Sequence, residues 1–131
     1  MVVDTSAIIA FLRNEPEAER IEEALEAASE CRMSAMTLFE CRTVLVRRFG
    51  QAMVDEFHRL LEAAGVTIMP FDEAQAAAAY DAYCRFGKGS GHPAQLNLAD
   101  CAAYALAKTL RLPLLFKGED FVHTDVESVL V

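Results

Sequence analysis

Short apolar runs alternate with longer amphipathic stretches along the chain. The runs are bounded by Gly, Pro, Asn and Asp, and each is too short for a helix, so they predict strands. The stretches between them carry apolar residues at helical spacing. We expect strands at 2–3, 31–35, 66–71 and 114–116, a final edge strand at 125–131, and helices over 7–12, 16–28, 37–49, 52–64, 72–87 and 97–110.

The helix boundaries follow from local signals. Ile21, Ala24, Leu25 and Ala28 form one apolar stripe. Capping boxes are predicted at Thr37–Glu40 and, in a similar form, at Asn97–Asp100. Thr5-Ser6 and Asp72 are further candidate caps, and Ala99, Ala103, Leu106 and Leu110 are expected to face inward. The stretch from 87 to 97, GKGSGHPAQLN, is the one clear loop, and its glycines predict mobility.

Strands that alternate with helices define the fold class. The pattern favours an α/β protein with a central, mostly parallel sheet flanked by helices on both faces. We expect one domain over residues 1–131, without linker or repeat. In such a sheet the carboxyl ends of the strands meet at one edge, where ligands bind.

Composition and charge exclude several classes of protein. Hydrophobic residues make up 53% of the chain, which argues against disorder, and no run is long enough to span a membrane. The first residues lack the basic flank of a signal peptide, so we expect a cytoplasmic protein. The four cysteines and three histidines have neither zinc-site nor disulfide spacing, and free thiols are expected.

The net charge of −8 argues against a protein that binds nucleic acid by phosphate neutralisation alone. The charge is uneven, however. Residues 1–30 hold eight acids against two bases, whereas residues 31–60 hold three acids against five arginines. Contact with nucleic acid would therefore need a local basic rim, or a metal that offsets the carboxylates.

Acidic side chains recur where the predicted strands end and helices begin. Asp4 closes the first strand, Glu40 and Asp100 stand near helix starts, and Glu119 and Asp120 follow the strand at 114–116. Singly, Glu40 and Asp100 fit helix capping and Asp120 an ordinary turn. Asp4 is harder to dismiss, because a buried acid is costly unless paired. Together they indicate a site for Mg²⁺, which prefers oxygen ligands.

Three blocks of sequence carry a resemblance to a known family. They are VVDTSAIIAFL at the start, MSAMTLFECRTVL, and LNLADCAAYALAKTLRLPLLFKGEDF. Their order and separation resemble the PIN-domain ribonucleases, specifically the VapC toxins of prokaryotic toxin–antitoxin pairs, over nearly the whole chain. The family's motif acids then fall on Asp4, Glu40 and Asp100.

The sequence departs from the family at the fourth acid. Many PIN domains have T-x-D after the last buried strand, where this chain has Phe116-Lys117-Gly118. Asp120, or else Glu119, is the candidate substitute. Phe-Lys-Gly-x-Asp-Phe also looks like a recurring variant among VapC toxins, which favours Asp120. Whether one or two metals bind depends on this ligand.

The resemblance implies a metal-dependent endoribonuclease. Asp4 and Asp100 would be direct or water-mediated ligands of Mg²⁺ or Mn²⁺. Glu40 and Asp120 would complete the catalytic acids, one of them orienting or deprotonating the attacking water, and Ser6 would hold a water or a phosphate oxygen. In-line attack would leave a 3′-hydroxyl and a 5′-phosphate.

The resemblance also implies the partners. VapC toxins form homodimers that a cognate VapB-type antitoxin binds, in heterotetramers or larger assemblies. The antitoxin's tail can send an arginine into the acidic pocket. RNA would be the substrate, DNA would be bound only through the antitoxin, and no membrane would be involved.

Two other classes of function remain alternatives. A catalytically weak or inactive PIN-like module that binds RNA or protein is suggested by the departure at Gly118. A phosphoacceptor receiver domain is also a small α/β fold, but it needs an acidic pair near the first strand, where Asp4 stands alone.

Several residues outside the acidic motif have two interpretations. Arg42, Arg47 and Arg48 could grip RNA phosphates, although pairing with the acidic segment 15–30 is favoured. Lys117 could contact a phosphate or form a local salt bridge, and Lys88 could lie over substrate or only solubilise its loop. The aromatic residues Tyr80, Tyr83 and Phe86 are expected to pack in the core or at a dimer interface rather than stack on bases.

Overall fold

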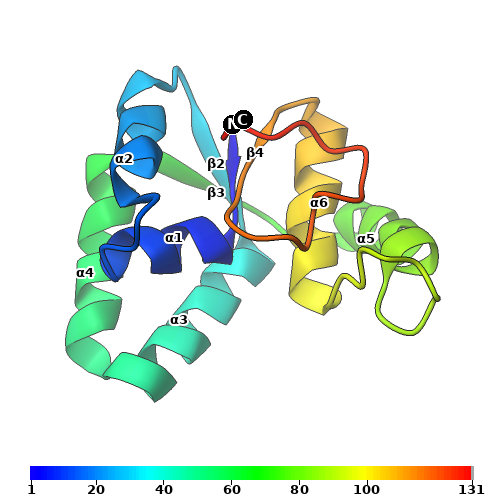
Figure 1. Ribbon diagram of the computed structural model, residues 1–131, viewed down its shortest axis with the longest axis horizontal. Helices are drawn as coiled ribbons and strands as arrows, with labels where there is room; N and C mark the ends of the chain where they lie inside the picture. Colours follow the sequence, from blue (N-terminus) through cyan, green and yellow to red (C-terminus); the bar gives the residue numbers. More distant parts are fainter. Residues whose placement is uncertain (131) are drawn as a thin grey trace.

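A four-stranded parallel sheet forms the centre of the computed structural model, which describes residues 1–130 (Figure 1). The strand order is β3-β2-β1-β4, so β1 lies inside the sheet between β2 and β4. The expected α/β fold is confirmed. The strands are β1 (Val2–Val3), β2 (Cys31–Ser34), β3 (Val66–Met69) and β4 (Leu114–Leu115), and the helices are α1 (Thr5–Leu12), α2 (Ala18–Ala27), α3 (Ala35–Phe49), α4 (Gln51–Ala63), α5 (Glu73–Phe86) and α6 (Leu98–Leu110).

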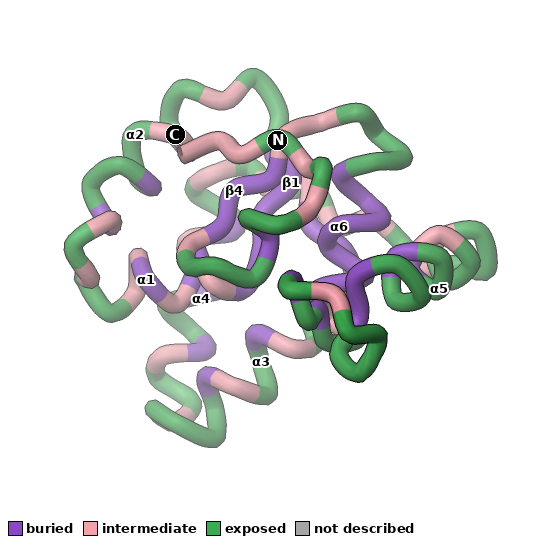
Figure 2. Tube along the Cα trace, turned by 45° about the vertical axis from the view of Figure 1, so that its right-hand side comes forward, coloured by how far each residue is buried: buried purple, intermediate pink, exposed green. Residues whose placement is uncertain are grey.

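The sheet separates two hydrophobic cores because successive strand residues point to opposite faces. Val3, Met33 and Leu115 pack with α1 to α4 on one face. Val2 and Leu114 pack with α5 and α6 on the other. Figure 1 shows these two groups of helices on either side of the sheet, and Figure 2 shows buried residues concentrated in β1, β4 and along α6.

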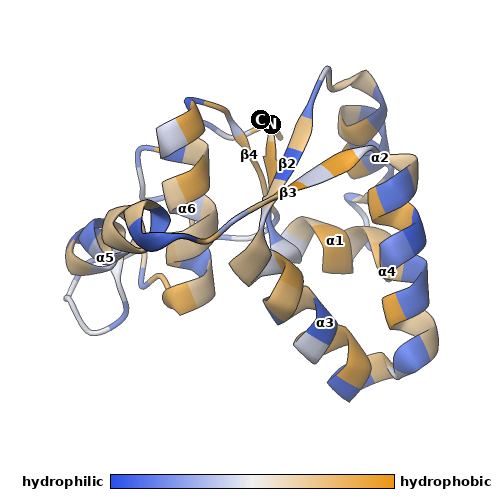
Figure 3. Cartoon of the chain, turned by 180° about the vertical axis from the view of Figure 1, so that it is seen from behind, coloured by the Kyte–Doolittle hydropathy of each residue, from blue (hydrophilic) through white to orange (hydrophobic). Residues whose placement is uncertain are grey.

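The amphipathic patterns place the helices as expected. Ile21 and Leu25 of α2 are buried, as are Val54, Phe57 and Leu61 of α4. Hydrophobic and hydrophilic residues alternate around α4 in Figure 3. The inward position predicted for Leu110 is wrong: it is 37% exposed, because it lies in the last turn of α6, beyond the buried stretch 101–107.

The start of α2 differs from the predicted one, because the helix begins at Ala18 rather than at Pro16. Two further helix starts also differ. α1 begins at Thr5 because Asp4, not Thr5 or Ser6, is its N-cap. α3 begins at Ala35, capped by Ser34, so the capping box predicted at Thr37–Glu40 is wrong. The chain passes directly from strand to helix at both points, and the residue at the junction is therefore the cap. The predicted Asp72 cap and the capping box at Asn97–Asp100 are confirmed.

The C-terminal segment differs from the prediction, whereas the mobility expected for the loop from 87 to 97 stays a prediction. No final strand forms over residues 125–130, where Leu114 and Ser128 make only an isolated bridge, and residue 131 lies outside the described residues. The loop from 87 to 97 is closed at its base by two backbone hydrogen bonds. Lys88 N donates to Leu96 O at 2.9 Å, and Leu96 N donates to Phe86 O at 2.8 Å.

Candidate active site

Asp4 is held at the carboxyl end of β1 by the first turn of α1. Its Oδ2 accepts hydrogen bonds from Ser6 N at 2.9 Å and from Ser6 Oγ at 2.6 Å. The residue is only 3% exposed. Burial raises the pKa of the Asp4 carboxyl, the bonds from Ser6 oppose this, and the nearby charge of Asp120 raises the pKa further. The carboxylate is therefore held in one orientation by Ser6, and these two hydrogen bonds do not fully offset the cost of burying its negative charge.

Ser6 joins the end of β4 to this turn. Its Oγ accepts a 3.0 Å hydrogen bond from the backbone N of Lys117 while donating to Asp4. Both contacts orient Asp4 and fix the segment that follows β4. The Ser6 hydroxyl proton is already donated to the Asp4 carboxylate. The role of Ser6 in holding a water or a phosphate oxygen stays a prediction.

Glu40 reaches the same edge from the second turn of α3. Thr5 Oγ1 donates a 2.5 Å hydrogen bond to Glu40 Oε1, and Cys41 Sγ donates to Thr5 Oγ1 at 3.3 Å. Burial raises the pKa of Glu40, and the charge of Asp4 adds to the effect. The contact between Thr5 and Glu40 was not predicted, because no local pattern relates two residues that lie 35 apart in the sequence.

Asp100 combines helix capping with a place among the acids. Asn97 Oδ1 accepts from Asp100 N at 2.8 Å, and Asp100 Oδ2 accepts from Asn97 N at 3.0 Å. Burial raises the pKa of Asp100 to about 7, with the charges of Asp4, Asp120 and Glu40 acting in the same direction. The two interpretations of this residue are therefore compatible: capping uses Oδ2 and leaves Oδ1 for another partner.

Asp120 is the fourth acid that the structure brings to this edge. It lies on the exposed turn after β4, and its charge raises the pKa of both Asp4 and Asp100. Glu119 contributes to neither shift. Gly118 precedes the turn with φ +98°, a left-handed backbone conformation that favours glycine. These charge interactions favour Asp120 over Glu119, and the identity of the fourth acid stays a prediction.

The four acids suit a hard divalent cation by their chemistry. Carboxylate oxygens are the donors that Mg²⁺ prefers, and a cation would relieve the repulsion that raises their pKa values. Within residues 1–130, no group of three His, Cys, Asp or Glu side chains forms a ready-made metal cluster. An ion held by one or two carboxylates, with water completing its shell, needs no such cluster.

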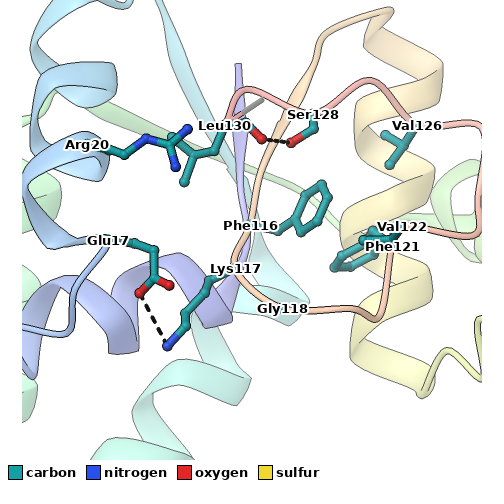
Figure 4. Close-up of a pocket in the computed structure, with 10 residues that line it drawn as sticks. All are labelled: Glu17, Arg20, Phe116, Lys117, Gly118, Phe121, Val122, Val126, Ser128 and Leu130. Atoms are coloured by element: carbon teal, nitrogen blue, oxygen red, sulfur yellow. Dashed lines mark hydrogen bonds and ion pairs between the residues drawn. The ribbon is translucent and has the colours of Figure 1, made fainter.

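A groove of about 340 Å³ opens beside this edge, between α2 and the C-terminal segment (Figure 4). Lys117 stands in its wall. Lys117 Nζ lies 2.6 Å from Glu15 Oε2 and 3.4 Å from Glu17 Oε2. The local salt bridge expected for Lys117 is therefore present.

Among the described residues neither Arg47 nor Arg48 forms a salt bridge with the acidic segment 15–30. The charge of Arg48 nevertheless helps to lower the pKa of Glu15 in that segment. Arg42 instead donates to His58 Nε2 at 3.2 Å. Phe86 packs in the core as expected, whereas Tyr80 is 67% exposed. The four cysteines are free, and Cys31, Cys41 and Cys101 are buried. No helix among residues 1–130 is long and apolar enough to cross a membrane.

Comparison with known proteins defines the class to which this fold and these acids belong. The PIN domain family matches residues 1–127. The chain therefore belongs to the PIN domain family, and the receiver-domain alternative is wrong.

Individual relatives narrow the comparison. Ribonuclease VapC28 of Mycobacterium tuberculosis is 47% identical over 130 residues, which cover 99% of this chain and 98% of the relative. Among solved structures, the sarcin–ricin loop cleaving toxin VapC20 of M. tuberculosis superposes with a TM-score of 0.78 at 15% identity, covering 98% of this chain and 97% of the other. A toxin–antitoxin complex from Klebsiella pneumoniae gives 0.68 at 19% identity, covering 95% and 92%. At 15% and 19% identity, the similarity to these two solved structures shows a shared fold and nothing more.

Proposed function

We propose that this protein is a metal-dependent endoribonuclease toxin of the VapC type, neutralised by a cognate VapB-type antitoxin. The observation that carries the proposal is the position of Asp4, Glu40, Asp100 and Asp120 at one sheet edge, where charges of neighbouring acids raise the pKa values of the first three. The close VapC ribonuclease relatives support it. The effect of the Asp120 charge on Asp4 and Asp100 supports this proposal over the alternative of a catalytically weak binding module.

The roles of the acids follow from their contacts. Asp4 and Asp100 would hold Mg²⁺ or Mn²⁺, which when bound lowers the pKa of a coordinated water and neutralises charge at the phosphate. Glu40, which accepts a hydrogen bond from Thr5, would orient and deprotonate the attacking water. Asp120 completes the acidic pocket from its exposed turn. In-line attack leaves a 3′-hydroxyl and a 5′-phosphate.

The same pocket suits a basic inhibitor. Four carboxylates at one edge attract a guanidinium, which pairs with carboxylates through two parallel hydrogen bonds. An arginine from the antitoxin would then occupy the space that the metal and the phosphate need. DNA binding belongs to the antitoxin.

A homodimer is the second part of the proposal. An apolar groove crosses α3, α5 and α6, and its exposed rim includes Tyr80 and Leu98, which are 67% and 72% exposed. Phe39 is 64% exposed on the neighbouring face of α3. Exposed apolar residues at this density favour burial against a second copy, as in VapC toxins. Two toxin chains with antitoxins would form a heterotetramer or a larger assembly.

The test is RNA cleavage by purified, antitoxin-free protein. A pooled substrate of structured tRNA and rRNA is incubated with Mg²⁺ or Mn²⁺, and with EDTA, beside Asp4→Asn, Asp100→Asn and the exposed control Asp81→Asn. We expect cleavage that needs metal, disappears in the first two variants and persists in the control. Absence of cleavage by folded wild-type protein would contradict the proposal and favour the binding module.

A further inference from the structure

Two arginines stand against the ring of Phe49, the last residue of α3. The guanidinium carbon of Arg13 lies 5.6 Å from the ring centroid, and that of Arg48 lies 5.2 Å from it. Arg13 is the C-cap of α1, so residues from two helices share one aromatic ring. Both distances fall in the range of cation–π contacts, which hold a guanidinium in place without using its N–H donors.

This arginine pair is connected to the acidic edge through intermediate residues. Glu15 connects the two regions: its Oε2 bonds to Lys117 Nζ at 2.6 Å, and its Oε1 lies 3.5 Å from Arg13 Nη1. The charge of Arg48 also helps to lower the pKa of Glu15. Lys117 in turn donates its backbone N–H to Ser6, which holds Asp4. A continuous chain of contacts therefore links the arginine pair to the candidate site.

The lengths of α1 and α3 determine the distance between the arginine pair and the acids of the candidate site. α1 and α3 both start at the carboxyl edge of the sheet and run away from it (Figure 1). Arg13 follows Asp4 by nine residues, and Arg48 follows Glu40 by eight. At about 1.5 Å per helical residue, the arginine pair lies roughly 12–14 Å from the acids along each helix. A few nucleotides of single-stranded RNA can bridge that span.

The two arginines on Phe49 offer positive charge in a chain that is acidic overall. The chain carries −8 overall, and the acids of the candidate site repel a phosphate backbone. Arg13 and Arg48 are the cations on the Phe49 ring. Asp55 and Glu56 line a shallow pocket beside Phe49, where Glu56 is paired with Arg59. The described residues give Arg48 no ion pair, and the single bond of Arg13 to Glu15 is long. Donors for an anion are therefore present beside the ring.

We propose that Arg13 and Arg48, held by Phe49, form a subsite for the phosphate backbone of the RNA that flanks the cleaved bond. The inference rests on the proposed function. Guanidinium groups bind phosphate through two parallel hydrogen bonds, and the shared ring reduces the entropy lost on binding. RNA is favoured over an acidic protein segment because a single strand of a few nucleotides spans the roughly 12–14 Å between the pair and the acids proposed to cleave a phosphodiester.

The test measures RNA affinity in a cleavage-deficient background. In Asp4→Asn protein we compare Arg13→Gln, Arg48→Gln, both together, and Phe49→Leu, using a labelled mixed-sequence single-stranded RNA and fluorescence anisotropy over a series of KCl concentrations. Arg111→Gln is the matched control, because this exposed arginine lies at the opposite end of α6 from Asp100. Thermal melts show whether each variant is folded.

We expect each arginine variant to weaken RNA binding about three- to fivefold at low salt, as is usual for loss of one exposed ionic contact. The double variant should reduce the slope of log affinity against log salt by about 1.4, or roughly 0.7 per phosphate contact on a single strand. Phe49→Leu should have an intermediate effect. With Asp4 restored, KM should rise by the same factor while kcat stays within about twofold.

The inference would be overturned if the Arg13 and Arg48 variants bound RNA with the same affinity and salt slope as Arg111→Gln. So would a polyglutamate peptide that binds through the arginine pair while RNA affinity is unchanged, since this would identify a surface for an acidic protein segment. The failure of the proposed function is distinct. Wild-type protein that binds RNA through the arginines without cleaving it would overturn the ribonuclease proposal and support the subsite.

Discussion

Thr5 Oγ1 donates a 2.5 Å hydrogen bond to Glu40 Oε1 across 35 residues of sequence. The contact joins the first turn of α1 to the second turn of α3. Glu40 is partly buried and has a raised pKa, so this hydroxyl is one of the few groups that stabilise its charged form. Thr5 is thus a positioning residue for Glu40.

Replacing Thr5 with Val should test that relationship, because Val keeps the volume and removes the hydroxyl. We expect kcat to fall about tenfold or more, as for weakened general-base catalysis, while KM changes little. Stability should fall by about 1–2 kcal/mol, since Cys41 also loses its partner. Thr5→Ser, which retains the hydroxyl, should stay near wild type in a cleavage assay. Equal rates for the two variants would show that the bond has no catalytic role.

Metal-free protein should become more stable as the pH falls. The pKa of Asp100 is raised to about 7 in the folded state, against an ordinary value of 3.8. The folded state therefore binds the proton more tightly, and the resulting stability is fully present below about pH 4 and lost as the pH rises through about 7. The gain is at most about 1.4 kcal/mol per pH unit.

Denaturation in EDTA between about pH 5 and about pH 8 would measure this dependence. In Asp100→Asn the dependence should be much weaker, and the variant should be more stable than wild type at about pH 8, because a buried charge is removed. A pH profile that is the same in both proteins would contradict the assignment.

Asp120 and Glu119 can be separated directly. The charge of Asp120 raises the pKa values of both Asp4 and Asp100, whereas Glu119 contributes to neither shift. We expect Asp120→Asn to reduce metal-dependent cleavage about tenfold or more and to raise the Mg²⁺ concentration needed, because one acid of the pocket is lost. Glu119→Gln, an equal change of charge one residue away, should stay within about twofold of wild type. The reverse order of effects would assign the fourth acid to Glu119.

The turn that carries Asp120 is anchored at its far end by Tyr104 of α6. The Tyr104 hydroxyl donates to Asp125 Oδ1, and Lys108 Nζ lies 3.1 Å from Asp125 Oδ2. Tyr104 is buried, so removing its hydroxyl in Tyr104→Phe should cost about 1–2 kcal/mol in urea denaturation. Tyr80→Phe on the exposed face of α5 is the control and should change stability by less than about 0.5 kcal/mol. A similar cost for the two variants would show that the anchor contributes nothing.

The proposed dimer face predicts a change of oligomeric state. Leu98 is 72% exposed in the single chain, so Leu98→Asp should leave the fold intact while placing a charge in the apolar contact. We expect sedimentation to give a dimer for wild type and a monomer for the variant. Val122→Asp, at a 53% exposed position outside the apolar groove, should remain dimeric. A monomeric wild type would refute the dimer.

Local sequence was enough to predict most elements and the chemistry of the candidate site. The apolar runs located the four strands, and the stripe containing Ile21 and Leu25 located a buried helix face, because both depend on short-range periodicity. The acids at strand ends and helix starts indicated a common edge, because parallel topology brings those positions together.

Tertiary structure decided what depends on contacts between distant segments. The partner of Glu40 is Thr5 rather than a helix cap, since Ser34 already caps α3. Arg13 and Arg48 meet on Phe49 because α1 and α3 pack together, although nothing in the sequence around Arg13 indicates this. Sequence patterns determine which residue types face the core and which end a helix. Only the packed fold determines which charged side chains lie close together. Electrostatic interactions depend on distances in space, and the order of residues along the chain does not fix those distances.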